Sequence, residues 1–157
     1  MLNREIVGQK EEQDYWDGIA GSFNGQGQHD LWRLHSDRVN SKLLEGWLPD
    51  HGIDRLLKTD LFDEAISEGL YPFLSARCSR VDGIDISQNV VDAALEKYPD
   101  LKAHLADLRD LPFEDRVFDG VVSTSSLDHF QQASDIDKAL RELFRITAPG
   151  GYLETFT

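Results

Sequence analysis

The sequence is poor in cysteine and in basic residues, and it contains no long apolar run. Its single cysteine, Cys78, excludes an intrachain disulfide and any metal site built from several thiolates. No stretch approaches the roughly 18 apolar residues that a membrane-spanning helix requires. Residues 1–13 are polar and charged, unlike a secretory signal peptide. These absences lead us to expect a cytoplasmic protein that does not insert into a membrane.

The shortage of basic residues gives the chain a strongly acidic balance. Its 157 residues include 16 Lys and Arg against 29 Asp and Glu, a formal net charge of −13. Such a surface repels the phosphate backbone of nucleic acids and the anionic headgroups of membranes. The acidic residues show no metal-ligand spacing, so we expect no metal site. We expect a small-molecule ligand, or a protein partner with a basic face.

Two zones of the chain differ in their hydrophobic pattern. Residues 1–53 have helical spacing, which predicts an N-terminal helical cap with a helix over 30–48. Over residues 54–157, short apolar runs alternate with helical stretches. The predicted strands are 55–60, 80–86, 101–106, 119–124 and 151–156, and the predicted helices are 64–77, 87–98 and 134–146. This alternation predicts one compact α/β domain, doubly wound, with a mostly parallel Rossmann-like sheet and helices on both faces.

An acidic residue stands at the end of each of the first three predicted strands: Asp60, Asp85 and Asp107. In a doubly wound sheet, ligands bind outside the carboxyl ends of the strands. A carboxylate at the end of the second strand can accept both hydroxyl hydrogens of a ribose, so Asp85 is a candidate for binding a nucleoside-type cofactor. Acidic residues also cap helices and project from solvated loops, and the pattern alone leaves that interpretation open.

Four segments resemble, in the right order, the motifs of class I S-adenosylmethionine-dependent methyltransferases of the small-molecule type. They are VDGIDIS at 81–87, ADLRDLPF at 106–113, FDGVVSTSSLDH at 118–129, and ALRELFRI followed by PGGYL within 139–153. The resemblance implies that S-adenosylmethionine is the cofactor. It implies that Asp85 and the neighbouring Ile86 lie at its ribose, and that Asp107 and Leu108 lie at its adenine. Ser123, on the fourth strand, would face the methyl donor.

The turn after the first predicted strand departs from that family. Family members usually have an acid there, followed by a glycine-rich turn, because the backbone must approach the ligand closely. This chain has Lys58 at the position of the acid and no glycine from residue 57 to residue 68. The resemblance implies that Thr59 and Asp60 lie near the methionine tail of the cofactor.

Two hypotheses explain the altered turn. In the first, Asp60 or Asp63 binds the ammonium of the methionine tail, and Lys58 faces the carboxylate of that tail or a neighbouring acid. In the second, Lys58 pairs with Asp85, Asp63 or Glu64, since a buried lysine needs a partner, and affinity for the cofactor is lost.

One residue near the fourth strand is a candidate for proton transfer. A general base is needed only if the methyl acceptor must lose a proton, and the ordinary pKa of histidine suits that role. His129 follows the fourth predicted strand, so it is the catalytic candidate. A histidine that donates to a backbone carbonyl explains the same pattern.

The fold that these motifs imply continues past its fifth strand with a helix and two further strands, for which this chain has no sequence. Either the chain is a fragment, or a second copy or a partner subunit covers the open edge of the sheet. We expect methyl transfer to a small-molecule acceptor. The alternative is a catalytically silent protein of the same fold that acts as a binding or regulatory subunit.

Overall fold

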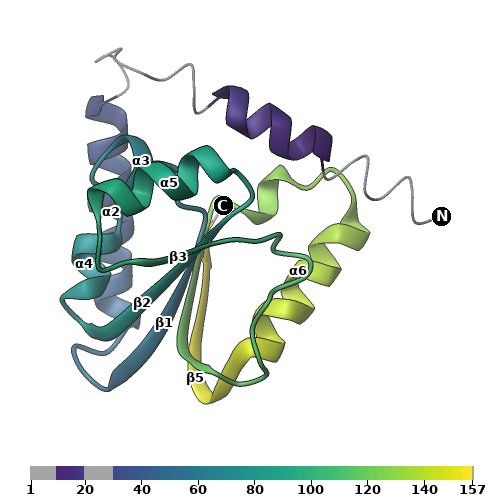
Figure 1. Ribbon diagram of the computed structural model, residues 1–157. Coiled ribbons are helices and arrows are strands. Elements are labelled where there is room, and N and C mark those ends of the chain that lie inside the picture. The colour runs from purple at the N-terminus through teal and green to yellow at the C-terminus, as the bar shows by residue number, and fades with distance from the viewer. Residues whose placement is uncertain (1–9, 20–29, 157) are drawn as a thin grey trace.

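The computed structural model describes residues 10–19 and 30–156, and it places a five-stranded sheet between two layers of helices (Figure 1). The strands are β1 (Ile53–Thr59), β2 (Cys78–Asp85), β3 (Lys102–Leu105), β4 (Phe118–Thr124) and β5 (Thr147–Phe156). The labelled helices are α2 (Asp30–Trp47), α3 (Phe62–Ile66), α4 (Tyr71–Ser75), α5 (Gln88–Lys97), the short 3-10 helix η1 (Leu127–His129) and α6 (Ala133–Ile146). A further helix covers residues 10–19. The predicted doubly wound α/β fold is confirmed.

All neighbouring strands pair in parallel, in the order β3-β2-β1-β4-β5. Along the chain, β2 and β3 are added on one side of β1, and β4 and β5 are then added on the other side. Strand order therefore reverses between β1 and β4, and ligands of such sheets bind at the carboxyl ends of the strands near this reversal. The ends of β1, β2, β3 and β4 are where the predicted site residues stand.

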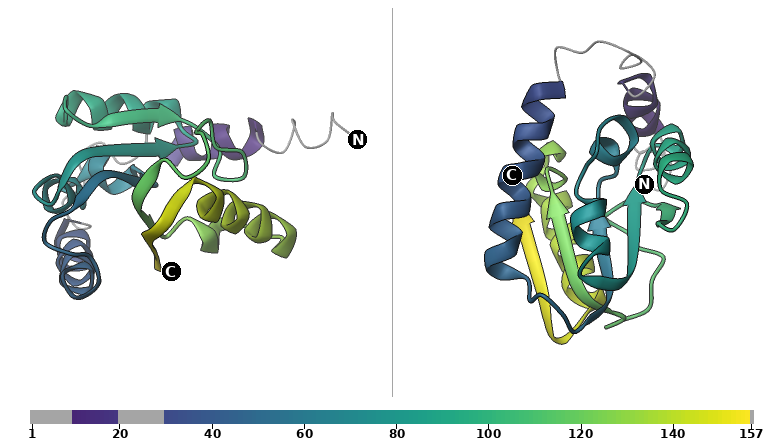
Figure 2. Two further views of the ribbon diagram at one scale, coloured as in Figure 1. Left: turned by 90° about the horizontal axis from the view of Figure 1, so that it is seen from below. Right: turned by 90° about the vertical axis from the view of Figure 1, so that its left-hand side faces the viewer.

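Helices lie on both faces of the sheet (Figure 2), and each face has its own hydrophobic core. On one face, β1, β2 and β4 pack against α2, α4 and α5, and Leu44 and Leu48 bring α2 into that core. On the other face, α6 inserts Ala139, Leu143 and Ile146 against the sheet. The helix after β2 begins where the sequence indicates, because the Ser87 hydroxyl accepts a hydrogen bond from the backbone N–H of Val90.

The single helix predicted over 64–77 is wrong. The structure has two short helices there, α3 and α4, with Gly69 between them at φ +67°. A side chain at this position would also collide with Glu64, whose carboxyl carbon lies 2.6 Å from an ideal Cβ. Cys78, which directly follows the predicted helix, is the first residue of β2 and is partly buried against the core.

The sheet contains a buried carboxylate, that of Asp82. Asp82 of β2 accepts hydrogen bonds from Arg55, Arg80 and His104, which come from three adjacent strands or their ends. Burial opposes ionisation of Asp82, but these three partners outweigh it and hold its pKa at about 2. The Arg55 guanidinium also stacks 4.5 Å from the centroid of the Phe118 ring.

No helix within residues 10–19 and 30–156 is long and apolar enough to cross a membrane.

Candidate functional site

The turn after β1 folds without glycine. Asp60 takes the left-handed conformation, with φ of 65°, which aspartate tolerates better than most residues. Its carboxylate accepts a hydrogen bond from the backbone N–H of Phe62 at 2.8 Å. The next residue, Leu61, is fully buried and packs on Gly83 of β2, where an added Cβ would lie 2.6 Å from the leucine methyl. Because Gly83 in the neighbouring strand has no side chain, Leu61 can fill the space beneath the turn.

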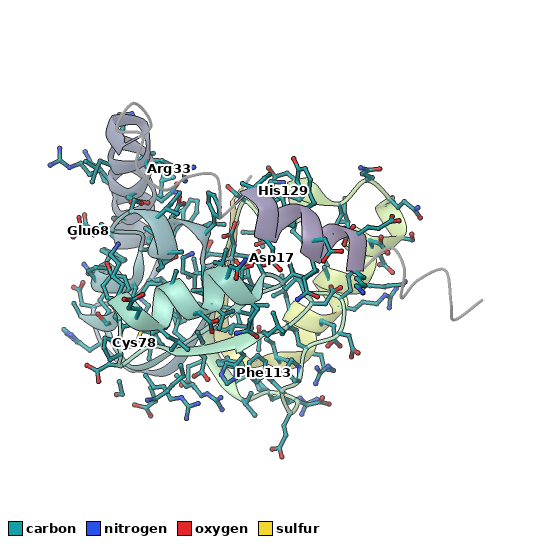
Figure 3. The ribbon with its side chains drawn as sticks, turned by 45° about the horizontal axis from the view of Figure 1, so that its top comes forward. Asp17, Arg33, Glu68, Cys78, Phe113 and His129 are labelled. Atoms are coloured by element: carbon teal, nitrogen blue, oxygen red, sulfur yellow. The ribbon has the colours of Figure 1, made fainter. Side chains whose placement is uncertain are left out.

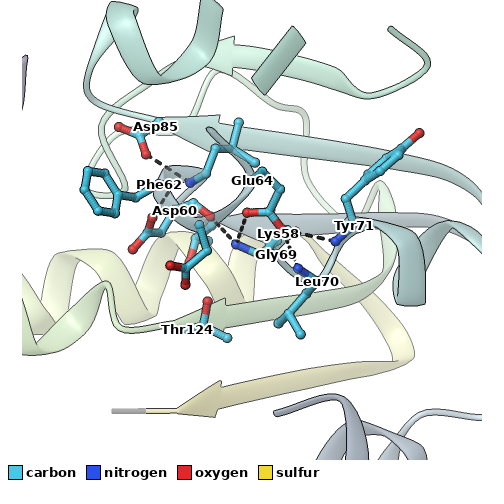
Figure 4. Close-up of polar contacts among 12 residues, drawn as sticks. Lys58, Asp60, Phe62, Glu64, Gly69, Leu70, Tyr71, Asp85 and Thr124 are labelled. Carbon is cyan, nitrogen blue, oxygen red and sulfur yellow. Dashed lines mark hydrogen bonds and ion pairs between the residues drawn. The ribbon is translucent and has the colours of Figure 1, made fainter. Parts of the chain in front are cut away.

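A buried ion pair fixes the same turn (Figure 4). The Lys58 Nζ lies 2.8 Å from the Glu64 Oε2, and both side chains are essentially inaccessible to solvent. The same ammonium donates to the backbone carbonyl of Asp60. The other Glu64 oxygen accepts from the backbone N–H groups of Leu70 and Tyr71, at 2.8 and 3.1 Å. Lys58 thus pairs with Glu64, which is one of the three partners in our second hypothesis and also a neighbouring acid of the kind that the first hypothesis allows.

Asp60 and Asp85 form the acidic end of the site. Asp85 ends β2, and its two carboxylate oxygens accept from the backbone N–H groups of Leu61 and Ser87, at 3.0 and 2.9 Å. Burial raises the pKa of Asp85, against these hydrogen bonds. Burial also raises the pKa of Asp60 to about 7; the charge of Lys58 opposes this rise and that of Asp85 adds to it. These two carboxylates interact with each other at the ends of adjacent strands.

Asp107 is held by a different partner. Both of its carboxylate oxygens accept from the guanidinium of Arg109, at 2.7 to 3.1 Å, and one also accepts from the Arg109 backbone N–H. Arg109 further pairs with Glu12 at 2.7 Å and with Asp135 of α6 at 3.2 Å. The following residue, Leu108, is buried in the core beside α6. The acid expected at the adenine is therefore neutralised by an arginine that also reaches the helix over residues 10–19.

The helix over residues 10–19 lies across the carboxyl ends of the strands (Figure 3). Asp17 accepts a hydrogen bond from the hydroxyl of Ser87, just after β2. The ring centroid of Trp16 lies 4.7 Å from that of His129, after β4, and 6.5 Å from that of Phe62, after β1. This helix lies within residues 1–53, for which the sequence predicts a helical cap. The glycine-rich stretch at 21–27, which we expect to act as a hinge, lies outside the described residues.

A cavity of about 180 Å³ opens beneath this helix, lined by Gln13, Ile86, Leu105, Ala106 and Asp107. Its walls come from the ends of β2 and β3 and from the cap. It is smaller than the roughly 300–1,000 Å³ of a typical small-molecule site, so it has room for a ring system but not for a whole nucleoside with its tail. The cavity adjoins the two positions, Ile86 and Asp107, that the resemblance places at the ribose and adenine.

Three hydroxyl groups meet at the reversal of strand order. Thr59, which ends β1, contacts the Ser123 hydroxyl at 2.9 Å and the Ser126 hydroxyl at 2.8 Å. Ser125 has a left-handed φ of 51°, which turns the chain sharply after β4. Thr59 and Ser123, two of the predicted site residues, are therefore in contact. Ser126 joins them; it lies within the motif at 118–129 but was not itself a predicted site residue.

His129 lies in η1 as an exposed residue against the cap. Its ring contacts Trp16 of the helix over residues 10–19, which lies across the site. The sequence did not reveal Gln13, Glu12 and Arg109 as parts of the site region, because their contacts join segments far apart in the chain. Its only signal for Arg109 was the acid two residues earlier, a spacing that suits a local ion pair.

Comparison with known proteins shows the family. The methyltransferase-domain family matches residues 65–155, more than half of the chain. Biotin biosynthesis bifunctional protein BioHC of Teredinibacter turnerae is 28% identical over 154 residues, covering 88% of this chain and 26% of that protein. Demethylmenaquinone methyltransferase of Streptomyces griseus is 36% identical over 80 residues, covering 51% of this chain and 33% of that protein. The chain thus spans about a quarter to a third of the length of these relatives.

A solved structure shows the same fold. The cyclase SpnF superposes with a TM-score of 0.66 at 24% identity, covering 84% of this chain and 48% of that one. The strand order, the ligand end of the sheet and the family match agree with one another. The chain belongs to the S-adenosylmethionine-dependent methyltransferases.

Proposed function

We propose that this chain binds S-adenosylmethionine beneath the helix over residues 10–19 and takes part in methyl transfer to a small-molecule acceptor. The observation that carries the proposal is the cavity between Ile86, the end of β3 and Gln13, whose wall at Ile86 directly follows Asp85 in the chain. A cavity of ring size next to a ribose-type acid suits the adenosine half of the cofactor. The strongly acidic surface and the relation to a demethylmenaquinone methyltransferase support a small acceptor.

The residues present fit the two halves of the cofactor differently. Asp85 would hold the ribose, since each of its oxygens has a lone pair beyond the one used by a backbone N–H. The cavity would take the adenine, with Arg109 keeping Asp107 in place. At the tail, Asp60 stands where glycine is usual, and it would meet the ammonium.

The cofactor, when bound, supplies a sulfonium methyl group for in-line displacement. The chain's own contribution is to orient the reactants and to exclude water. The cap covers the strand ends, and its Trp16 closes the space between Phe62 and His129. His129 would accept a proton from an acceptor that must lose one.

Calorimetric titration with S-adenosylmethionine tests the proposal. We expect micromolar affinity in the parent chain, loss of most of it in Asp85→Ala, and no change in Asp137→Ala. Asp137 is a matched control because it lies exposed on α6 and pairs only locally with Arg141. Absence of binding at millimolar ligand in the parent chain would refute the proposal.

A second candidate is a catalytically silent, cofactor-binding subunit. The observation that favours it is the turn after β1, where a buried ion pair and Phe62 occupy positions usually given to an acid and glycines. Radiolabelled methyl transfer to a panel of acceptors, with demethylmenaquinone included, separates the candidates. Cofactor binding with no transfer to any acceptor, alone or with a partner subunit, would favour the silent subunit.

A further inference from the structure

The cations nearest the turn after β1 already have acidic partners. Lys58 pairs with Glu64 at 2.8 Å. Arg33 of α2 pairs with Asp63 at 2.6 Å. Each cation therefore lies closer to another acid than to Asp60 or Asp85, and the charge of Lys58 lowers the pKa of these two carboxylates without forming an ion pair with either.

Asp60 and Asp85 are balanced less well. They stand at the ends of the paired strands β1 and β2, and they receive backbone N–H groups from the same turn, at Phe62 and Leu61. Within residues 10–19 and 30–156 neither carboxylate forms an ion pair. Burial raises the pKa of both groups, and their mutual repulsion contributes to the rise at Asp60. A positive charge placed between them would replace repulsion with attraction.

The carboxylates at the opposite end of the site have ion-pair partners. Asp107 is bound by the guanidinium of Arg109 through both oxygens, and Arg109 also pairs with Glu12 and Asp135. A ligand spanning the two ends would therefore meet carboxylates without an ion pair only near Asp60 and Asp85. The electrostatic contrast between the ends favours a ligand with an uncharged ring at one end and a cationic tail at the other.

We propose that the site ranks adenosyl ligands by the net positive charge of the sulfur-bearing tail, and that Asp60 determines the ranking. This inference rests on the proposed function. S-adenosylmethionine carries a sulfonium and an ammonium against a single carboxylate, whereas the demethylated product has lost the sulfonium charge. Decarboxylated S-adenosylmethionine keeps both positive charges and has no carboxylate. The order of affinity is decarboxylated S-adenosylmethionine, then S-adenosylmethionine, then S-adenosylhomocysteine.

The ranking has a consequence for turnover. A site that prefers the sulfonium form releases the product more readily than it binds the methyl donor. Product inhibition is then weak, because loss of the sulfonium charge lowers the net positive charge of the tail and with it the attraction of the tail to Asp60.

The test is a calorimetric series with these three ligands and adenosine, on the parent chain, Asp60→Asn and Asp137→Asn, at pH 8 and low salt. Asparagine tolerates the left-handed conformation and keeps an oxygen for the Phe62 N–H, so the Asp60→Asn turn should form. We expect each added positive charge to tighten binding about tenfold in the parent chain and in Asp137→Asn. In Asp60→Asn the steps should shrink to about threefold or less.

Two outcomes would overturn the ranking while leaving the proposed function intact. One is a parent chain that binds S-adenosylhomocysteine as tightly as S-adenosylmethionine. The other is an undiminished series in Asp60→Asn. Binding of no ligand in the series, adenosine included, would instead overturn the proposed function and the ranking with it.

Discussion

Replacing Lys58 with methionine removes the positive charge of a buried ion pair and keeps most of the side-chain volume. The side chains of Lys58 and Glu64 are 2% and 0% exposed, and their charged atoms lie 2.8 Å apart. Breaking a buried pair by removing one partner costs about 3–5 kcal/mol, because the remaining charge stays buried without compensation. We expect Lys58→Met to lower the free energy of unfolding by that amount.

Glu64→Gln tests the pair from its other side. The glutamine keeps an oxygen for the backbone N–H groups of Leu70 and Tyr71, so it removes the charge and leaves that hydrogen bonding possible. It should cost about as much as Lys58→Met, since it leaves an ammonium buried. The double variant removes both charges of the pair and should lie within about 2 kcal/mol of the parent chain. The two single costs should therefore be far from additive.

Urea unfolding followed by circular dichroism measures all three variants, with Arg141→Met as control. Arg141 forms an exposed pair with Asp137, so its removal should not change the midpoint measurably. If Lys58→Met costs less than about 1 kcal/mol, or if the double variant costs the sum of the single ones, the ion pair does not stabilise the turn as we argue.

Three further predictions concern the surroundings of the site. Burial, with the nearby Asp63, raises the pKa of Asp37 to about 6, above its ordinary 3.8, so the folded state loses stability as pH rises from about 4 to about 6 and keeps that loss at higher pH. Asp37→Asn, which keeps an acceptor for the Gly69 N–H, should be more stable than the parent at pH 8 by up to about 3 kcal/mol and should therefore unfold at a higher temperature. At pH 4 the two should melt together, and a constant difference across pH would contradict this assignment. Gly69→Ala should cost about 2 kcal/mol or more in urea unfolding, because φ is +67° and the added Cβ meets Glu64; a neutral result would refute the close packing. Arg109→Met should speed amide hydrogen exchange over residues 10–19 and leave α5 unchanged, because Arg109 joins Glu12 to Asp107; unchanged exchange over residues 10–19 would refute that link.

Most of the fold could be predicted because its signals are local. Apolar runs of strand length ended at acidic or small residues, and Ser87 marked the start of α5. The helix over 64–77 failed for a non-local reason. Its apolar spacing suits one helix, but Glu64 reaches across to the backbone of Leu70 and Tyr71, and Gly69 turns the chain between them.

The site was predictable where one strand end determines a residue's place. Thr59, Asp60, Asp85 and Ser123 all stand at the carboxyl end of the sheet, since parallel strands share that edge. Partners of these residues were not predictable in the same way. The sequence left three acidic residues as partners for Lys58, and only the packing of the folded chain selects Glu64 among them. The link from Glu12 to Arg109 joins residues nearly a hundred positions apart and has no pattern in the sequence.

The lysine and the glutamate are best understood as one change in the turn after β1. A glycine-rich turn leaves room for a ligand and relies on an acid in the strand for its charge. Here the strand position carries Lys58, and the balancing carboxylate comes from Glu64, which also ties down the backbone at Leu70. Because Lys58 and Glu64 pair with each other, the acid that the turn itself offers to a ligand is Asp60. On our proposal a ligand tail would meet a carboxylate held by a left-handed turn rather than by a strand, so removal of the Asp60 charge should alter recognition without dismantling the sheet.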